Sequence, residues 1–138
     1  MLKLGKAALV AAAVVVSPVL AKAGTIRGIG WNIVEVDGRP MAADVGAWLR
    51  LQGSTVSGRG ACNTFRGTVI GDPDTQALRL SVDVTTRMAC WDQESEAAIF
   101  VALAAVRSWR PDQSGAVLLL DDGGTPIMRL APRPPAER

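Results

Sequence analysis

GRGACNTFRG at residues 58–67, followed by TTRMAC at residues 85–90, contains both cysteines of this 138-residue chain. Each cysteine has small or turn-forming neighbours rather than other metal-ligand residues. Gly58, Gly60 and Gly67 frame the first motif, which lacks the Gly-Lys-Ser/Thr ending of a phosphate-binding loop. We therefore interpret the glycines as sites of turns, bulges or close chain approach, and expect Asn63 to adopt a left-handed turn or to bond the local backbone.

The N-terminus has the three parts of a secretory signal peptide. Two lysines precede a continuous apolar run at about residues 7–16, and Ala-Lys-Ala at 21–23 forms a cleavage site. An uncleaved anchor helix is the alternative, but spanning a bilayer takes ~20 apolar residues and this run is shorter. We predict removal of residues 1–23 and a periplasmic or secreted protein. The residue directly after the cleavage site is Gly24 rather than cysteine, so we expect neither a lipoprotein nor a stable membrane anchor.

Cleavage changes the charge of the chain. All three lysines lie in residues 1–23, so the remaining 115 residues hold 12 arginines against 13 acidic residues. The formal net charge falls from +2 to −1. A near-neutral domain lacks the basic surface that is typical of nucleic-acid binding. We expect one domain and a monomer, with no nucleic-acid partner.

The residue types that are missing limit the possible chemistry. The chain has no histidine and no tyrosine, and the predicted mature part has no lysine. The usual imidazole base, Schiff-base amine, phenol acid and imidazole metal ligand are therefore excluded. Chemistry based on carboxylates alone remains possible in principle. We predict a protein that is not an enzyme, with no catalytic residue, metal or cofactor.

Cys62 and Cys90, 28 positions apart, allow three interpretations. In an exported protein two thiols favour a disulfide, which would stabilise a loop of this size by ~3–4 kcal/mol. Alternatively, both are buried reduced thiols that pack as small apolar groups. A reactive thiol is the third possibility, because Cys90 lies just before a predicted helix whose N-terminus would lower its pKa.

Alternating apolar residues predict most of the strands. Residues 30–36 form the first, with Trp31, Ile33 or Val34, and Val36 as apolar anchors, and Asp37-Gly38 as a turn. The clearest alternation is at 78–84, apolar at even positions. Further strands are predicted at 47–51, 55–58, 65–70, 116–120 and 127–130.

One helix is predicted after Asp92, which can cap it, and it should end near Ser108. Apolar residues at 99, 100, 103 and 106 repeat at helical spacing. Several strands, one helix and a hairpin predict an α+β fold, with a mainly antiparallel sheet of about 6–8 strands and the helix packed on it. Three prolines in residues 132–138 predict a disordered tail after a domain at 24–131.

The two motifs resemble the signature of the META domain family, which includes HslJ-like heat-shock proteins. Family members have Gly-Cys-Asn, an aromatic residue and a glycine, then Thr-x-Met-Ala-Cys before a helix. Ala61 departs from that pattern. The matching positions, which we expect to be structural, are Gly60, Asn63, Phe65, Gly67, Thr86, Arg87 and Met88. The resemblance spans roughly residues 29–131 and implies a role in the cell envelope, in tolerance of heat or of antibiotics.

Two further groups of residues are candidate binding sites. Arg66 and Arg87 could together bind an anionic group, or could pair with acids or face solvent. The four tryptophans are scattered, and we expect them to pack in the core; Trp91 beside Cys90 is the one plausible contact residue.

The sequence thus predicts an exported, non-enzymatic domain with an unidentified envelope partner or ligand. The alternative is a module that binds a hydrophobic small molecule or an envelope protein. An apolar cavity of ligand size would favour the small molecule, and a filled core with an exposed apolar patch would favour the protein.

Overall fold

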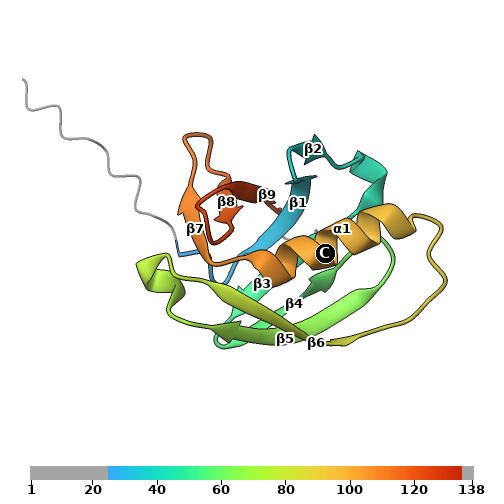
Figure 1. Cartoon of the computed structure of the whole chain (residues 1–138), viewed down its shortest axis with the longest axis horizontal. Helices are drawn as coiled ribbons and strands as arrows, with labels where there is room; N and C mark the ends of the chain where they lie inside the picture. The colour runs from blue at the N-terminus through green and yellow to red at the C-terminus, as the bar shows by residue number, and fades with distance from the viewer. Residues whose placement is uncertain (1–24, 135–138) are drawn as a thin grey trace, which may run out of the picture.

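The computed structural model describes residues 25–134 and has one antiparallel sheet with one α-helix, α1, packed against it (Figure 1). Eight strands follow the order β6-β5-β4-β3-β1-β9-β8-β7, and β2 pairs with β1 beside this path. The α+β prediction is therefore confirmed. The elements are β1 (Gly30–Val36), β2 (Arg39–Pro40), β3 (Trp48–Gln52), β4 (Thr55–Arg59), β5 (Thr64–Ile70), β6 (Arg79–Thr85), α1 (Gln93–Ala105), β7 (Ser108–Pro111), β8 (Val117–Leu120) and β9 (Pro126–Pro132).

The sheet curls until its two edges approach each other. The segment just before the edge strand β6 reaches the other edge through a bridge between Ala77 and Ser108. Leu78 N donates to Arg107 O at 3.1 Å, and Trp109 N donates to Gln76 O at 3.0 Å. Beyond this point the edges separate, and α1 lies across the opening (Figure 1).

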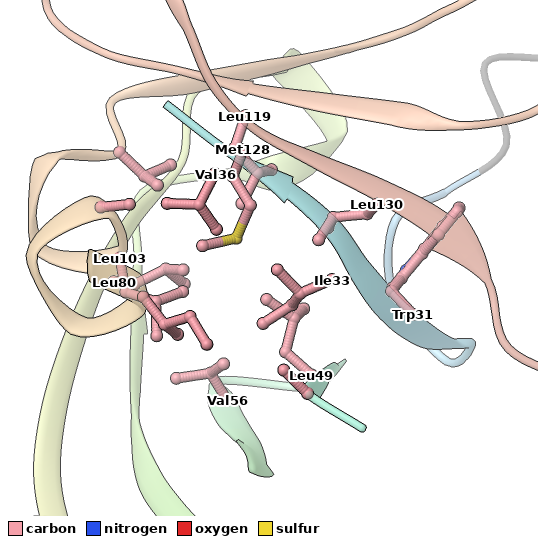
Figure 2. Packing of buried hydrophobic residues seen from close by; sticks show 14 of the residues in the cluster. Trp31, Ile33, Val36, Leu49, Val56, Leu80, Leu103, Leu119, Met128 and Leu130 are labelled. Carbon is pink, nitrogen blue, oxygen red and sulfur yellow. The ribbon is translucent and has the colours of Figure 1, made fainter. Parts of the chain in front are cut away.

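The interior of the curled sheet is filled with apolar side chains. Figure 2 shows residues of β1, β3, β4, β6, β8, β9 and α1 pointing toward a common centre. Leu49, Leu103, Leu119 and Leu130 are fully buried there. Within residues 25–134, no helix has the length and apolarity needed to cross a membrane.

The first strand, β1, ends at the predicted turn, and its pairing explains the uneven spacing of its apolar residues. Asp37 and Gly38 both have positive φ, 50° and 76°, as a two-residue hairpin turn requires. The pairing of β1 with β9 shifts register between Ile33 and Glu35. This bulge lets Trp31, Ile33 and Val36 all face the core.

The helix begins as predicted but ends earlier. The side chain of Asp92 accepts a hydrogen bond from Ser95 N at 3.1 Å, which caps α1. The helix ends at Ala105, because Val106 is already extended. Arg107 then donates to Ala104 O and Val106 O, the carbonyl groups at the helix end. The next residues form β7, which ends at Pro111. The sequence pattern did not predict this short strand.

The alternation predicted for residues 78–84 is only half right. Leu78 and Leu80 are buried, but Val84 is 66% exposed. The cause is a bulge: Gly67 pairs with Val82, whereas Arg66 pairs with Val84, so the intervening residue on β6 is unpaired. Val84 therefore shares a face with the exposed Arg66 rather than with the core.

The last strand extends further than the prolines predicted. Pro132 pairs with Trp31 at the end of β9, and Arg133 N donates to Gly30 O at 2.8 Å. A proline is tolerated at the end of a ladder, where its missing N–H need not pair. The predicted tail from residue 132 is thus partly wrong; residues 135–138, like the predicted signal peptide, lie outside the described residues.

Candidate functional site

The two motifs meet at the N-terminal end of α1. Cys62 and Cys90 form a disulfide, and their Cα atoms are 5.5 Å apart, within the normal range for such a bond. This selects the first of the three interpretations of the cysteines. The bond ties the turn between β4 and β5 to the segment that leads into α1.

Asn63 is the only buried polar residue of the part of the chain that the structure describes. Its Oδ1 accepts from Met88 N at 2.7 Å and from Thr86 Oγ1 at 3.0 Å. Thr86 Oγ1 in turn accepts from Thr64 N at 3.1 Å. The amide of Asn63 therefore connects the first motif to the backbone of the second, 25 residues further along the chain, next to the disulfide. The prediction for Asn63 is wrong, because its side chain does not bond the local backbone and its φ is not positive.

Glu96, in the first turns of α1, completes this arrangement. Its Oε2 accepts from Cys62 N, Asn63 N and Asn63 Nδ2, each at 3.1 Å. A carboxylate forms strong hydrogen bonds with such donors, so Glu96 fixes the helix to the turn. We call Cys62, Asn63, Thr86, Cys90 and Glu96 the motif junction.

Each of the three glycines of the first motif lies where a Cβ would make a close contact. A Cβ on Gly60 would collide with Glu96 Oε1 and lie 3.2 Å from Glu96 Cδ. A Cβ on Gly67 would collide with Ser81 O and lie 2.9 Å from Val82 Cα, beside the bulge of β6. The glycines of the first motif thus lie at close approaches, which is one of the roles predicted for them.

The junction also holds the one cluster of possible metal ligands found in residues 25–134. One ligand atom each of Cys62, Cys90 and Glu96 lies within 4.8 Å of the others. Both sulfur atoms are used in the disulfide, so neither is a thiolate ligand. Glu96 Oε1 is buried without a hydrogen-bond partner among the described residues.

The remaining motif residues divide into core and surface. Phe65 is buried and packs edge-on against Phe100, with ring centroids 5.5 Å apart. Arg66 and Arg87 are both exposed and line different pockets: Arg66 on the outer face of the sheet, Arg87 against α1. Met88 uses only its backbone in the junction, and its side chain is 63% exposed.

The tryptophans do not all pack in the core. Trp31 and Trp109 are buried, and their indole N–H groups donate to Ile26 O and Pro73 O. Trp48 is half-buried, with Arg133 4.8 Å above its ring. Trp91 is 83% exposed, so the core prediction is wrong for this residue. The two residues beside Trp91 are held in place, Cys90 by the disulfide and Asp92 by its hydrogen bond from Ser95 N, whereas the side chain of Trp91 faces solvent.

Sequence reasoning missed the role of Glu96. Acidic residues are common in the first turn of a helix because they interact favourably with the positive end of the helix dipole. This general effect already explained an acidic residue at position 96, so the sequence did not indicate a specific partner. The available signal was its position, six residues after Cys90 at the start of the helix that the second motif precedes.

Comparisons with known proteins identify a family and two similar folds. Residues 24–133 match the META domain family. Two solved structures are similar to this chain. An NMR structure of a protein from Burkholderia xenovorans has a TM-score of 0.60 and 22% identity, covering 78% of this chain and 83% of the other. A crystal structure of a DUF4847 family protein from Bacteroides vulgatus has a TM-score of 0.57 and 16% identity, covering 77% and 93%.

At these identities the two structures support the fold alone. A search of curated proteins finds no match. The family match covers most of the chain and includes both motifs of the junction, so the chain belongs to the META domain family.

Proposed function

We propose that this chain is an exported, non-enzymatic META domain that binds a partner protein in the cell envelope and contributes to tolerance of envelope stress. The observation that carries the proposal is the motif junction. Its cysteines are oxidised, and Asn63 and Glu96 hydrogen-bond to each other and to backbone amides. The signature residues therefore serve the fold, which leaves function to the surface around them.

The disulfide supports export. Stable disulfides form in oxidising compartments such as the periplasm and are rare in the cytosol. The bond between Cys62 and Cys90 therefore favours a location outside the cytosol.

A protein partner is favoured over a hydrophobic small molecule. The centre of the curled sheet is occupied by packed side chains (Figure 2), which argues against an internal ligand cavity. Large apolar side chains are exposed instead near the second motif, including Val84, Met88 and Trp91. Exposed apolar side chains are typical of a protein-binding surface where they lie together in one patch.

Native mass spectrometry of the protein purified from its own periplasm tests these points together. We expect a chain that begins at Gly24, is two hydrogens lighter than the reduced form, and carries a protein partner. A mature chain that retains residues 1–23, or a stoichiometric small ligand, would contradict the proposal. A hydrolase screen should show no turnover; turnover abolished by replacing one Asp or Glu would make it an enzyme.

The envelope role has its own test. A strain that lacks the protein should grow less well than its parent under heat or in antibiotics that cross the outer membrane. Equal growth under these stresses would remove this part of the proposal.

A further inference from the structure

A groove runs along the side of the molecule where α1 faces the edge strand β6. It consists of two adjoining pockets of about 390 and 570 Å³, which share Thr85 and Phe100. One pocket lies against the second motif and contains Met88; the other continues along β6 past Val82. We call the two together the α1–β6 groove.

The backbone of β6 is unpaired along this groove. β6 is the terminal strand of the sheet and pairs only with β5. Just before β6, Leu78 N donates to Arg107 O at the other edge of the sheet. Among the described residues, no backbone hydrogen bond outside the β5 ladder involves residues 79–85. A free strand edge of this kind can accept an added strand through main-chain hydrogen bonds.

The inner wall of the groove suits apolar side chains. α1 contributes Ala97, Phe100 and Ala104, spaced three and four residues apart and therefore on one face of the helix. The two alanines leave the space that the pockets occupy. An added strand would point alternate side chains into this space and the others toward solvent.

The rim of the groove is positively charged. Arg79 and Arg107 line one pocket and Arg87 the other, whereas Glu96 is the only acidic residue that lines either. Glu96 is already bonded to three donors. Neither Arg79 nor Arg87 forms an ion pair with another residue of the described range. An acidic partner would therefore be complementary in charge.

We propose that the α1–β6 groove binds an extended segment of a partner protein, which adds to the sheet at β6 and carries apolar residues flanked by Asp or Glu. This rests on the proposed function and names the surface and the chemistry of the partner. Apolar side chains of the segment contact Phe100 and Val82, and its carboxylates lie near Arg79 and Arg87. A second copy paired through its own β6 would bring the same arginines together, which like-charge repulsion disfavours.

The test selects a phage-displayed library of random dodecapeptides on the folded, oxidised domain, residues 24–138. We expect the enriched peptides to combine Asp or Glu with alternating apolar residues and to lack central proline, which cannot join a ladder. A synthetic peptide of the enriched sequence should shift the NMR amide signals of residues 79–85 and of Ala97 and Phe100. Its affinity should fall with salt.

Matched variants separate the groove from the rest of the surface. Ala97→Glu places a charge in the groove, and Val101→Glu places the same charge on a helix residue that is 68% exposed and lines neither pocket. Arg79→Glu reverses a rim charge, and Arg110→Glu reverses an exposed arginine outside the groove. We expect about fivefold or greater loss of peptide affinity for Ala97→Glu and Arg79→Glu, from lost space and lost ion pairing. The two controls should bind as the parent does.

Several results would overturn the groove. The first two are a selection that enriches no peptide, and an enriched peptide that shifts NMR amide signals outside the groove. The third is an equal loss of peptide affinity in the groove variants and the controls. The fourth is a β6-paired dimer, seen by light scattering and abolished by Ala97→Glu. A different binding surface would leave the proposed function intact. Catalytic turnover, by contrast, would remove the proposed function whatever the groove binds.

Discussion

Asn63 and Glu96, 33 residues apart in the chain, are joined by two hydrogen bonds of 3.1 Å to a single carboxylate oxygen. The same oxygen also accepts from Cys62 N. The backbone N–H groups of Cys62 and Asn63 lie between two strands and belong to neither ladder. Glu96 supplies the acceptor that buried backbone donors need, and this is why the helix and the turn depend on each other.

Removing that acceptor should destabilise the domain. Glu96→Ala leaves two backbone amides and the amide of Asn63 without their partner, and should lower the free energy of unfolding by about 2–3 kcal/mol. Glu94→Ala, on the exposed side of the same helix turn, should change it by less than ~0.5 kcal/mol. Urea unfolding of both variants measures this. Equal stability of the two would mean that the carboxylate is not needed by the turn.

Gly67 should tolerate no side chain. Gly67→Ala places a methyl group against Ser81 O and Val82 Cα at the β6 bulge, where backbone atoms must move. We expect a loss of about 2 kcal/mol or more in unfolding free energy. Gly123→Ala is the control, because a Cβ there meets only Asp121 Oδ1 at 3.5 Å and φ is not positive. A Gly67→Ala protein as stable as this control would contradict the bulge geometry.

The hairpin between β7 and β8 predicts a pH dependence. Hydrogen bonds from the Ser114 hydroxyl and, to a lesser extent, from Ser114 N hold the pKa of Asp112 below its usual value. The charge of Arg129 and a hydrogen bond from Ala116 N lower this pKa further. A lowered folded-state pKa stabilises the fold above the unfolded pKa of about 3.9, and the effect disappears as pH falls through the folded pKa. Asp112→Asn should therefore be less stable than the parent at pH 6, and the difference should shrink toward pH 2.

Urea unfolding at several pH values measures that difference, with Asp122→Asn, an exposed residue of the β8–β9 turn, as the control. A gap between Asp112→Asn and the parent that is constant from pH 6 to pH 2 would show that ionisation of Asp112 does not contribute.

Local sequence signals predicted the parts of the fold that local physics decides. Asp37-Gly38 requires a hairpin turn, and Asp92 caps α1 as its side chain allows. The alternation at residues 78–84 failed at Val84, because the bulge depends on how β5 pairs with β6. Pairing across strands is not encoded in one strand's own pattern.

The same distinction applies to the candidate site. The cysteines favoured a disulfide between the two motifs, and the glycines indicated turns, bulges or close chain approach. Glu96 was missed because its partners, Cys62 and Asn63, lie more than 30 residues away along the chain. The exposure of Trp91 was also missed, because composition favours burial of tryptophan and only the path of the segment before α1 decides otherwise.

The central claim is that the two signature motifs form one structural junction, and thermal unfolding with and without reductant tests it most directly. Reduction of Cys62–Cys90, or Cys62→Ala with Cys90→Ala, removes a cross-link between residues 28 positions apart, so the unfolded chain gains conformational entropy. The free energy of unfolding should fall by ~2–4 kcal/mol. For a domain of about 100 residues, ~1 kcal/mol shifts Tm by ~4–8 °C, so we predict a fall of at least about 8 °C. Equal Tm values for the oxidised, reduced and doubly substituted proteins would contradict the account.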